Sequence, residues 1–238
     1  MIQRKEYLEK LISWRDKQMI KVVTGVRRCG KSTLFRLYID YLKSTGVTDE
    51  QIISVNLEDL DHEDLLQYRS LYSYVKERIC KDKTTYVFLD EVQNCQHFEK
   101  AVDSLYIKPN IDVYITGSNA YMLSGELATL LSGRYITIDM LPLSFREYLE
   151  ACDTRETNSK DQFNDYIRFG SFPYVSMLNR TDTIITPYLD GIYNTILVKD
   201  VARREGITDI PLLESIVKCV ASSIGSPISI KKISDTLN

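Results

Sequence analysis

The chain has 238 residues, with 30 Lys+Arg against 33 Asp+Glu and 44% hydrophobic residues, which is typical of a globular protein and excludes a disordered or fibrous one. Its net charge of −3 provides no overall field that would draw it to nucleic acid or to anionic lipid. No apolar run approaches the roughly 18 residues that span a bilayer, and the first residues are too charged for a signal peptide, so no membrane partner is expected.

The first element with a chemical signature is a short strand that leads into a glycine-rich loop. A β-branched run over 21–24 ends at Gly25, and residues 25–32 match the pattern GxxxxGK[ST]. Apolar residues then recur at helical spacing as far as Gly46, which can end a helix in the left-handed conformation. Strand, loop and helix in this order predict a phosphate-binding loop, in which glycines let successive backbone N–H groups approach a phosphate.

Every residue of this loop is a candidate contact to a nucleotide. Lys31 is expected to reach the β- and γ-phosphates, and the Ser32 hydroxyl to bind Mg²⁺. The predicted nucleotide contacts are Gly25, Val26, Arg27, Arg28, Cys29, Gly30, Lys31, Ser32 and Thr33. The two arginines could add positive charge around the phosphates or pair with acids beneath the loop. A helix amino end lowers a thiol pKa, but we favour Cys29 as a small residue that fills space.

The next elements are a strand over 52–57, a long helical stretch over about 62–80, and a buried strand that ends in two carboxylates. That strand reads YVFLDE over 86–91. Asp90 fits the residue that holds the Mg²⁺ shell, and Glu91 is placed to accept a proton from an attacking water. Two adjacent carboxylates are often only a solvated surface pair. We favour the catalytic interpretation here because the pair follows a buried strand and lies downstream of the glycine-rich loop.

A helix near 98–107, a strand over 112–116, a helix near 120–131 and a strand over 134–139 follow. Strands that alternate with helices predict an α/β fold with a five-stranded parallel sheet and right-handed crossovers. One extra strand separates the loop strand from the Asp–Glu strand. This pattern resembles the division of P-loop proteins with an added strand and a catalytic glutamate, which includes the AAA-type ATPases. The resemblance implies the sheet order 5-1-4-3-2.

The same resemblance gives candidate roles to two further positions. AAA-type proteins keep a polar sensor of the γ-phosphate after the fourth strand, where Ser118 is the first choice here and Asn119 the second. The alternative is an ordinary turn, which these residue types favour. An arginine finger that acts on a neighbouring subunit's nucleotide would correspond to Arg134, which implies a homo-oligomer. A surface arginine or a structural salt bridge is weighed equally.

The last third of the chain is predicted to be helical. Ser144 and Glu147 form a capping box at the start of a helix over 142–151. A polar hinge over 153–161 is followed by helices near 162–169, 183–204 and 211–224. Arg203 and Arg204 could form a second sensor, although a solvated helix end is favoured. We therefore expect an ATPase core over 1–152, a helical lid over 153–225, and the start of a winged helix over 226–238.

Five ordered motifs carry a closer family resemblance: TGVRRCGKST, FLDEVQ, ITGSNA, LPLSFREYL and YIRFGSFPYV. Together they resemble a large bacterial and archaeal family of AAA-type ATP-binding proteins with a C-terminal domain of unknown function. That family is related to STAND-like archaeal ATPases and to origin-recognition proteins. The resemblance covers nearly the whole chain and implies ATP binding, hydrolysis and a helical lid. Members are usually near 400 residues long, so this chain is expected to lack most of the C-terminal half.

The sequence therefore predicts an ATPase that hydrolyses ATP with Mg²⁺ and moves its lid in response. The candidate catalytic residues are Lys31, Glu91, Ser118 and Arg134, and the candidate metal ligands are Ser32 and Asp90. Two alternatives stay open: a nucleotide-gated switch with little hydrolysis, and a DNA-binding ATPase whose recognition element lies beyond Asn238. Five scattered cysteines without a CxxC pair favour a reducing, cytoplasmic setting over a disulfide framework or zinc cage.

Overall fold

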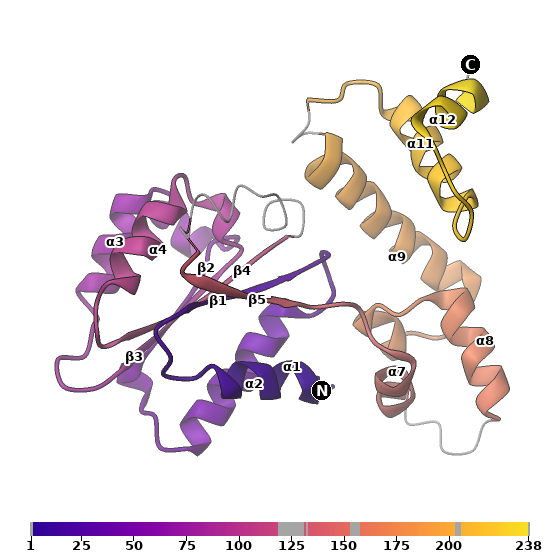
Figure 1. Cartoon of the computed structure of the whole chain (residues 1–238). Coiled ribbons are helices and arrows are strands. Elements are labelled where there is room, and N and C mark those ends of the chain that lie inside the picture. Colours follow the sequence, from indigo (N-terminus) through magenta and orange to yellow (C-terminus); the bar gives the residue numbers. More distant parts are fainter. Residues whose placement is uncertain (1, 119–130, 132, 153–157, 203–205, 238) are drawn as a thin grey trace. The chain divides into compact units, whose positions relative to one another are not determined.

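The computed structural model describes residues 2–118, 131, 133–152, 158–202 and 206–237. The chain divides into two compact units, Met1–Thr186 and Pro187–Asn238, and Figure 1 labels their elements. The first unit contains the whole sheet. Among the described residues, no helix is both long and apolar enough to cross a bilayer. The predicted division into core, lid and winged-helix start stays a prediction.

The sheet of the first unit has five parallel strands. They are β1 (Ile20–Gly25), β2 (Ile52–Asn56), β3 (Thr85–Asp90), β4 (Ile111–Ser118) and β5 (Tyr135–Asp139). Their order across the sheet is β2-β3-β4-β1-β5, which is the predicted order 5-1-4-3-2 read from the other edge. The predicted α/β fold class and strand order are therefore confirmed.

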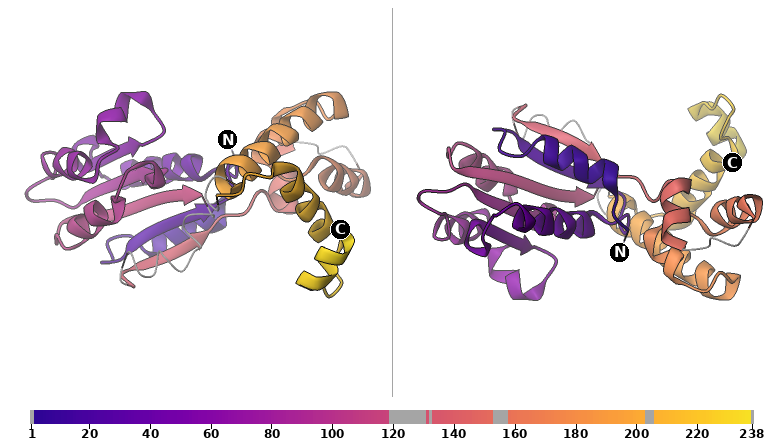
Figure 2. Two further views of the ribbon diagram at one scale, coloured as in Figure 1. Left: turned by 90° about the horizontal axis from the view of Figure 1, so that it is seen from above. Right: turned by 90° about the horizontal axis from the view of Figure 1, so that it is seen from below.

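Helices cover both faces of this sheet (Figures 1 and 2). The helices α1 (Lys5–Ser13) and α2 (Lys31–Ser44) share one apolar cluster with the sheet, and α3 (Tyr68–Lys76) and α4 (Phe98–Tyr106) share the other. Residues of β3 alternate between these clusters, with Val87 in one and Phe88 in the other. Coverage on both faces explains why the central strands β1 and β3 are buried along their whole length.

The predicted helical stretch over about 62–80 is wrong in two respects, because it is interrupted near its start and because α3 ends at Lys76. A 3-10 helix, η2 (Leu60–Leu65), precedes α3, and the two are separated by an extended Gln67 (φ −108°, ψ 131°). Gln67 forms a parallel β-bridge with Gln96, and the two side chains share a hydrogen bond of 3.0 Å. This non-local pairing requires extended backbone where the local apolar spacing favours a continuous helix.

The remaining helices follow the sheet in chain order. The capping box predicted at Ser144 and Glu147 is present, since the Glu147 carboxylate accepts from the Ser144 N–H at 2.9 Å and the Ser144 hydroxyl accepts from the Glu147 N–H at 3.3 Å. The predicted helix over 183–204 is only partly α-helical, because a π-helical segment forms its second part. The predicted helix over 120–131 lies almost wholly outside the described residues.

The other elements have the following bounds. The later helices are α7 (Phe145–Cys152), α8 (Ser159–Phe169), α9 (Asp182–Thr195), the π-helix η5 (Ile196–Ala202), α11 (Ile210–Ser222) and α12 (Ile230–Leu237). The short 3-10 helices are η1 (Asp49–Gln51), η3 (Val92–Asn94) and η4 (Pro173–Met177).

Candidate nucleotide-binding site

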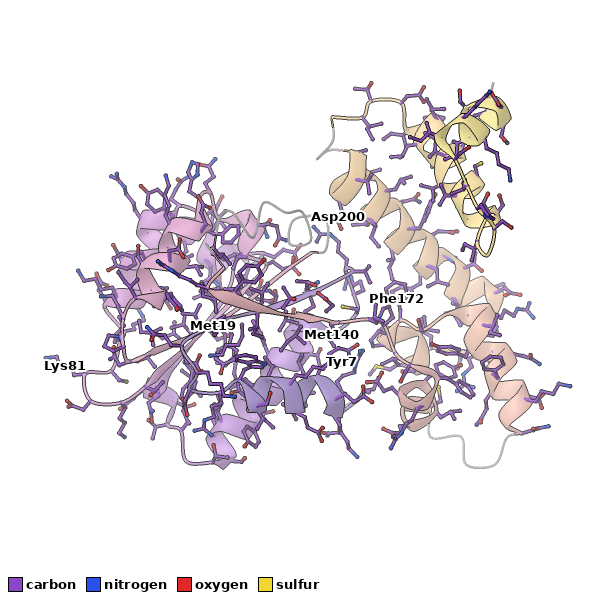
Figure 3. All side chains as sticks on the ribbon, viewed as in Figure 1. Tyr7, Met19, Lys81, Met140, Phe172 and Asp200 are labelled. Carbon is purple, nitrogen blue, oxygen red and sulfur yellow. The ribbon has the colours of Figure 1, made fainter. Side chains whose placement is uncertain are left out.

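The glycine-rich loop joins the carboxyl end of β1 to the amino end of α2. Its two glycines have positive φ, +153° at Gly25 and +106° at Gly30, where other residues are strained. A Cβ atom on Gly25 would lie 2.4 Å from the Met140 carbonyl oxygen and 2.8 Å from the Cys29 sulfur. Met140, labelled in Figure 3, follows β5 and borders the loop. The loop therefore folds as it does because position 25 has no side chain.

The other loop residues differ in exposure. Cys29 is completely buried, and burial raises the pKa of its thiol despite the nearby charges of Lys31 and Arg4. The pKa-lowering effect expected of a helix amino end is thus outweighed by desolvation. Arg27 forms an ion pair with Glu58 at 3.5 Å at the surface. The remaining members are the exposed Arg28 and Ser32 and the half-buried Val26 and Thr33.

Lys31 connects the loop to the strand-end carboxylates. The residue is 4% exposed, and its ammonium donates to the carbonyl oxygens of Gly25 at 3.2 Å and Val26 at 3.4 Å. The same nitrogen lies 3.4 Å from Glu91 Oε1. Lys31 and Glu91 come from sequence positions 60 apart, and parallel strands bring them together because their carboxyl ends meet at one edge of the sheet.

Asp90 and Glu91 are tied to the neighbouring strand by one hydroxyl. The Thr116 hydroxyl of β4 donates to the Asp90 carboxylate and accepts from the Glu91 N–H at 2.9 Å. Glu91 adopts a left-handed conformation (φ 54°, ψ 51°), which is uncommon for a residue with a side chain and concentrates at functional sites. Both carboxylate residues are 8% exposed.

Gln93 completes the surroundings of Glu91. Its amide nitrogen donates to Glu91 Oε2 at 2.5 Å, while Lys31 faces Oε1, so each carboxylate oxygen has a partner. The carbonyl oxygen of the Gln93 side chain is buried without a hydrogen-bond partner in the described part of the chain. A buried acceptor of this kind is suited to a water that enters beside Glu91.

The structure therefore brings Lys31, Asp90 and Glu91 together at one edge of the sheet, and it places beside them two residues that the sequence reasoning missed. Thr116 lies inside the quoted motif ITGSNA, and Gln93 lies inside FLDEVQ. A hydroxyl at the end of a buried strand, and an amide two residues after the second acid, were the available signals. Neither identifies a partner, because the contacts depend on how β3 and β4 pair.

Ser118 and Arg134 occupy opposite ends of the sheet. Ser118 ends β4 in register with Gly25, so its backbone borders the loop. The side chain of Ser118 and the residues Asn119, Arg203 and Arg204 lie outside the described part.

Arg134 is exposed at the opposite end of the sheet. Its carbonyl oxygen accepts a hydrogen bond from the Ile20 N–H at 2.9 Å, and its guanidinium lies over the Tyr106 ring at 5.6 Å. Ile20 begins β1 and Gly25 ends it, which separates them by roughly 17 Å. Arg134 therefore lies away from the glycine-rich loop of its own chain.

The donor atoms at the loop fit Mg²⁺. Ser32 offers an exposed hydroxyl, and Asp90 offers a carboxylate held by Thr116. Oxygen ligands of this kind suit Mg²⁺, which usually takes one or two carboxylates together with waters and substrate phosphates. No group of three or more His, Cys, Asp or Glu among the described residues could hold a metal by itself. The site thus suits a metal that arrives with a phosphate ligand.

Two family models match the chain. Residues 17–149 match an AAA domain, and residues 160–238 match a domain of unknown function (DUF8612). The first match covers the sheet, the glycine-rich loop and both carboxylates.

Similar proteins come from bacteria and archaea. An uncharacterized protein of Haemophilus influenzae is 38% identical over 240 residues, which cover 100% of this chain and 60% of that protein. An uncharacterized protein of Methanocaldococcus jannaschii is 30% identical, covering 92% of this chain and 50% of that protein. The chain thus spans 50–60% of the length of these two relatives.

Solved structures with low sequence identity share the fold. The Walker-type ATPase Paby2304 of Pyrococcus abyssi has a TM-score of 0.63 at 13% identity, over 100% of this chain and 88% of that one. The Aeropyrum pernix ORC1 protein, solved in complex with DNA, has a TM-score of 0.51 at 12% identity, over 100% of this chain and 77% of that one.

Proposed function

This chain belongs to the AAA-type family of P-loop ATPases, and on that premise we propose that it binds ATP with Mg²⁺ and hydrolyses the bond between the β- and γ-phosphates, which releases ADP and phosphate. One observation carries the proposal. The ammonium of Lys31 in the glycine-rich loop lies 3.4 Å from the carboxylate of Glu91 at the end of β3. A phosphate-binding cation and a candidate general base thus share one site, which hydrolysis of a phosphate anhydride requires.

Lys31 would bind the phosphates by exchanging partners. In this structure its ammonium is held by two carbonyl oxygens at 3.2 and 3.4 Å and by Glu91. These contacts are longer than the 2.7–2.9 Å usual for a charge-assisted hydrogen bond. The phosphate oxygens of ATP would offer shorter ones, and Lys31 would leave Glu91.

Ser32 and Asp90 would hold the metal. When bound, Mg²⁺ neutralises charge on the phosphates. The Thr116 hydroxyl, which donates to Asp90, fixes the carboxylate at the site.

Glu91 would act as the general base once Lys31 has moved to the phosphates. Gln93 would keep its hydrogen bond to Oε2, so that Oε1 is free to accept a proton from water. The buried carbonyl oxygen of Gln93 would accept a second hydrogen bond from that water. Ser118, whose backbone borders Gly25, would contact the γ-phosphate as a sensor, with Asn119 as the second choice. Hydrolysis would then be coupled to movement of the helical segment after residue 153.

Substitution of Lys31 tests the phosphate-binding assignment. Lys31→Ala should reduce the ATP affinity by about a hundredfold or more, the scale of a lost charge-assisted hydrogen bond at a buried site. The measurement is isothermal titration calorimetry with ATP and Mg²⁺. Lys43→Ala, which changes an exposed lysine in the last turn of the same helix, is the matched control and should bind ATP normally. Unchanged affinity in a folded Lys31→Ala protein would refute the assignment.

A switch with little hydrolysis is the second candidate, and the position of Arg134 favours it. A chain whose own candidate arginine finger lies at the far end of the sheet would bind ATP and wait for a further component. Arg134 of a second copy would supply it, because Arg134 lies away from its own chain's loop. Mixing Arg134→Ala with Lys31→Ala proteins should then restore part of the activity. No restoration in a mixture shown to co-assemble would leave Arg134 a structural role.

DNA binding is kept as an alternative for the longer relatives, whose length this chain covers only in part. The fold is shared with ORC1, which was solved in complex with DNA. A steep decrease of duplex affinity with salt, measured on a full-length relative, would support it. We also propose a cytoplasmic location, which the five free cysteines support.

A further inference from the structure

Arg4, which precedes α1, reaches the glycine-rich loop although it lies 25 residues before Cys29. The residue is 4% exposed and adopts a left-handed conformation (φ 46°, ψ 46°). Its guanidinium donates to the carbonyl oxygen of Cys29 at 3.2 Å and to that of Leu141 at 2.5 Å, and its Nε lies 3.0 Å from Glu147 Oε1. One buried cation thus connects the loop, the segment after β5 and the first turn of α7.

Tyr7 supports this arrangement from α1. The Arg4 guanidinium lies over the Tyr7 ring at 4.8 Å, and the Tyr7 hydroxyl accepts from the Leu141 N–H at 3.1 Å. Figure 3 labels Tyr7 close to Met140, the residue that also borders Gly25. The side chain of Arg4 is therefore held on a ring, between two carbonyls and against a carboxylate.

The bond to the Cys29 carbonyl has a consequence for Gly30. A trans peptide is planar, so the C=O of one residue and the N–H of the next point in opposite directions. When Arg4 holds the Cys29 oxygen, the Gly30 N–H is fixed on the far side of that peptide plane, away from the guanidinium. In phosphate-binding loops, the N–H groups of this part of the loop are those that surround the phosphate.

We propose that Arg4 is a positioning residue for phosphate binding, which orients the Cys29–Gly30 peptide so that the Gly30 N–H faces the phosphate before ATP arrives. This inference rests on the proposed function. Arg4 does not act as a direct phosphate ligand, because it is almost fully buried, its two terminal nitrogens donate to carbonyl oxygens, and its charge is paired with the Glu147 carboxylate. Its effect is preorganisation of the loop, which reduces the ordering that binding requires.

Nuclear magnetic resonance can observe this peptide directly. Cys29–Gly30 is the only Cys–Gly pair in the chain, so protein labelled with ¹³C at cysteine carbonyls and ¹⁵N at glycines selects the Gly30 amide. In the nucleotide-free protein, Arg4→Met should shift that signal, and the ATP affinity should fall by about ten- to a hundredfold. Tyr7→Phe is the control: it removes one hydrogen bond at the same junction, and the Gly30 signal should stay in place.

A purely structural role predicts something different. If Arg4 had only a structural role, Arg4→Met would have a lower melting temperature, while the Gly30 signal and the ATP affinity of the folded protein would stay unchanged. That result would overturn the proposal. A loss of affinity without a shift of Gly30 overturns it as well. If Arg4→Met does not fold, Arg4→Lys decides, because an ammonium lacks the fork that bridges two carbonyls and should give an intermediate loss.

The two readouts separate this inference from the proposed function. Failure of the wild-type protein to bind ATP would refute the proposed function, whereas the Gly30 signal reports on Arg4 without any nucleotide. Normal ATP binding by both wild type and Arg4→Met would refute the role of Arg4 alone.

Discussion

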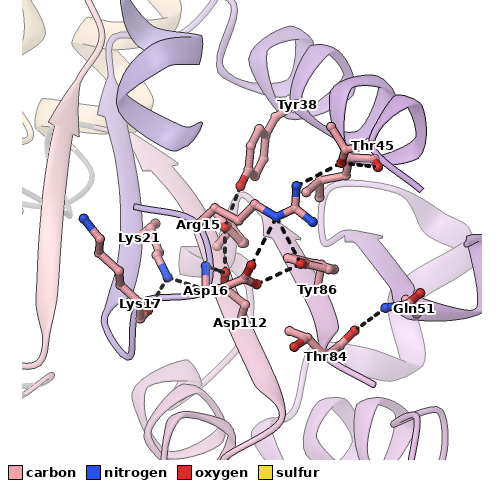
Figure 4. Close-up of polar contacts among 12 residues, drawn as sticks. Arg15, Asp16, Lys17, Lys21, Tyr38, Thr45, Gln51, Thr84, Tyr86 and Asp112 are labelled. Atoms are coloured by element: carbon pink, nitrogen blue, oxygen red, sulfur yellow. Dashed lines mark hydrogen bonds and ion pairs between the residues drawn. The ribbon is translucent and has the colours of Figure 1, made fainter. Parts of the chain in front are cut away.

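Replacement of Lys21 by methionine is expected to destabilise the protein, because it removes the counterion of a buried carboxylate. Lys21, near the start of β1, is 0% exposed, forms an ion pair with Asp112 of β4, and donates to the Lys17 carbonyl at 2.5 Å (Figure 4). Asp112 is 3% exposed and also accepts from the Asp16 N–H at 2.9 Å and the Tyr114 hydroxyl at 2.8 Å. This network lies at the amino ends of the strands, so stability can be tested apart from nucleotide binding.

The magnitude follows from the burial of both charges. Burial lowers the pKa of Lys21 and raises the pKa of Asp112, so for each group the loss of solvation outweighs the attraction of its partner. Removal of one member of a buried pair costs about 3–5 kcal/mol, whereas replacement of both by neutral groups is often nearly neutral. We therefore expect a loss of about 3–5 kcal/mol for Lys21→Met, and less than about 2 kcal/mol when Asp112→Asn is added.

The loss in Lys21→Met should also depend on pH. A carboxyl group whose pKa is raised in the folded state contributes stability below its unfolded pKa of about 3.9, and this is lost as the pH rises through the folded pKa. Without Lys21 that folded pKa rises further. The variant should therefore be closest to wild type in mild acid and furthest from it at neutral pH.

Urea unfolding, followed by circular dichroism at pH 5 and pH 7.5, measures these differences. Lys43→Met, which breaks an exposed ion pair with Asp49, is the control and should unfold with the wild type. If the double variant is as unstable as Lys21→Met, the loss comes from packing or from the Lys17 contact. That result would refute the explanation that the Asp112 carboxylate is destabilising because it is buried without a counterion.

Three further predictions concern the site. Gly25→Ala should reduce ATP affinity by about tenfold or more, because its Cβ would lie 2.4 Å from the Met140 carbonyl oxygen and the loop would have to move; unchanged affinity by calorimetry would contradict this. Since burial raises the pKa of the Cys29 thiol, less thiolate is present at pH 8, and iodoacetamide should modify Cys29 more slowly than the half-buried Cys80; equal rates by mass spectrometry would argue against it. Thr116→Val should lower turnover about tenfold or more while the protein stays folded, because both strand-end acids lose a hydrogen bond; wild-type turnover would exclude that role.

The fold could be predicted from local patterns wherever those patterns agree with the tertiary contacts. The strands β1 and β3 are covered on both faces, and the mostly apolar runs that such coverage favours are visible in the sequence. The break at Gln67 could not be predicted, because it depends on a bridge to Gln96, 29 residues away. The strand order came from the family resemblance, since alternation of strands and helices alone allows several orders.

In the candidate site too, the contiguous motifs could be predicted from the sequence and the residues that act through non-local contacts could not. The glycine-rich loop and the acids at 90 and 91 could be predicted because each is a contiguous motif with a known mechanism. Arg4 could not, because nothing near it in the sequence indicates that it bonds to the carbonyl of Cys29. Thr116 acts through the pairing of β3 with β4, which places its hydroxyl between Asp90 and the Glu91 N–H.

Single-turnover ATP hydrolysis, measured with ATP affinity for wild type and Glu91→Gln, tests the central proposal most directly. With Mg²⁺, the wild type should bind and hydrolyse ATP, and Glu91→Gln should bind it but turn over about a hundredfold or more slowly, the scale of a lost general base. Chelation of Mg²⁺ should abolish hydrolysis in both. Equal hydrolysis by the two proteins would contradict the role of Glu91, and tight ATP binding without hydrolysis by either would instead favour the switch.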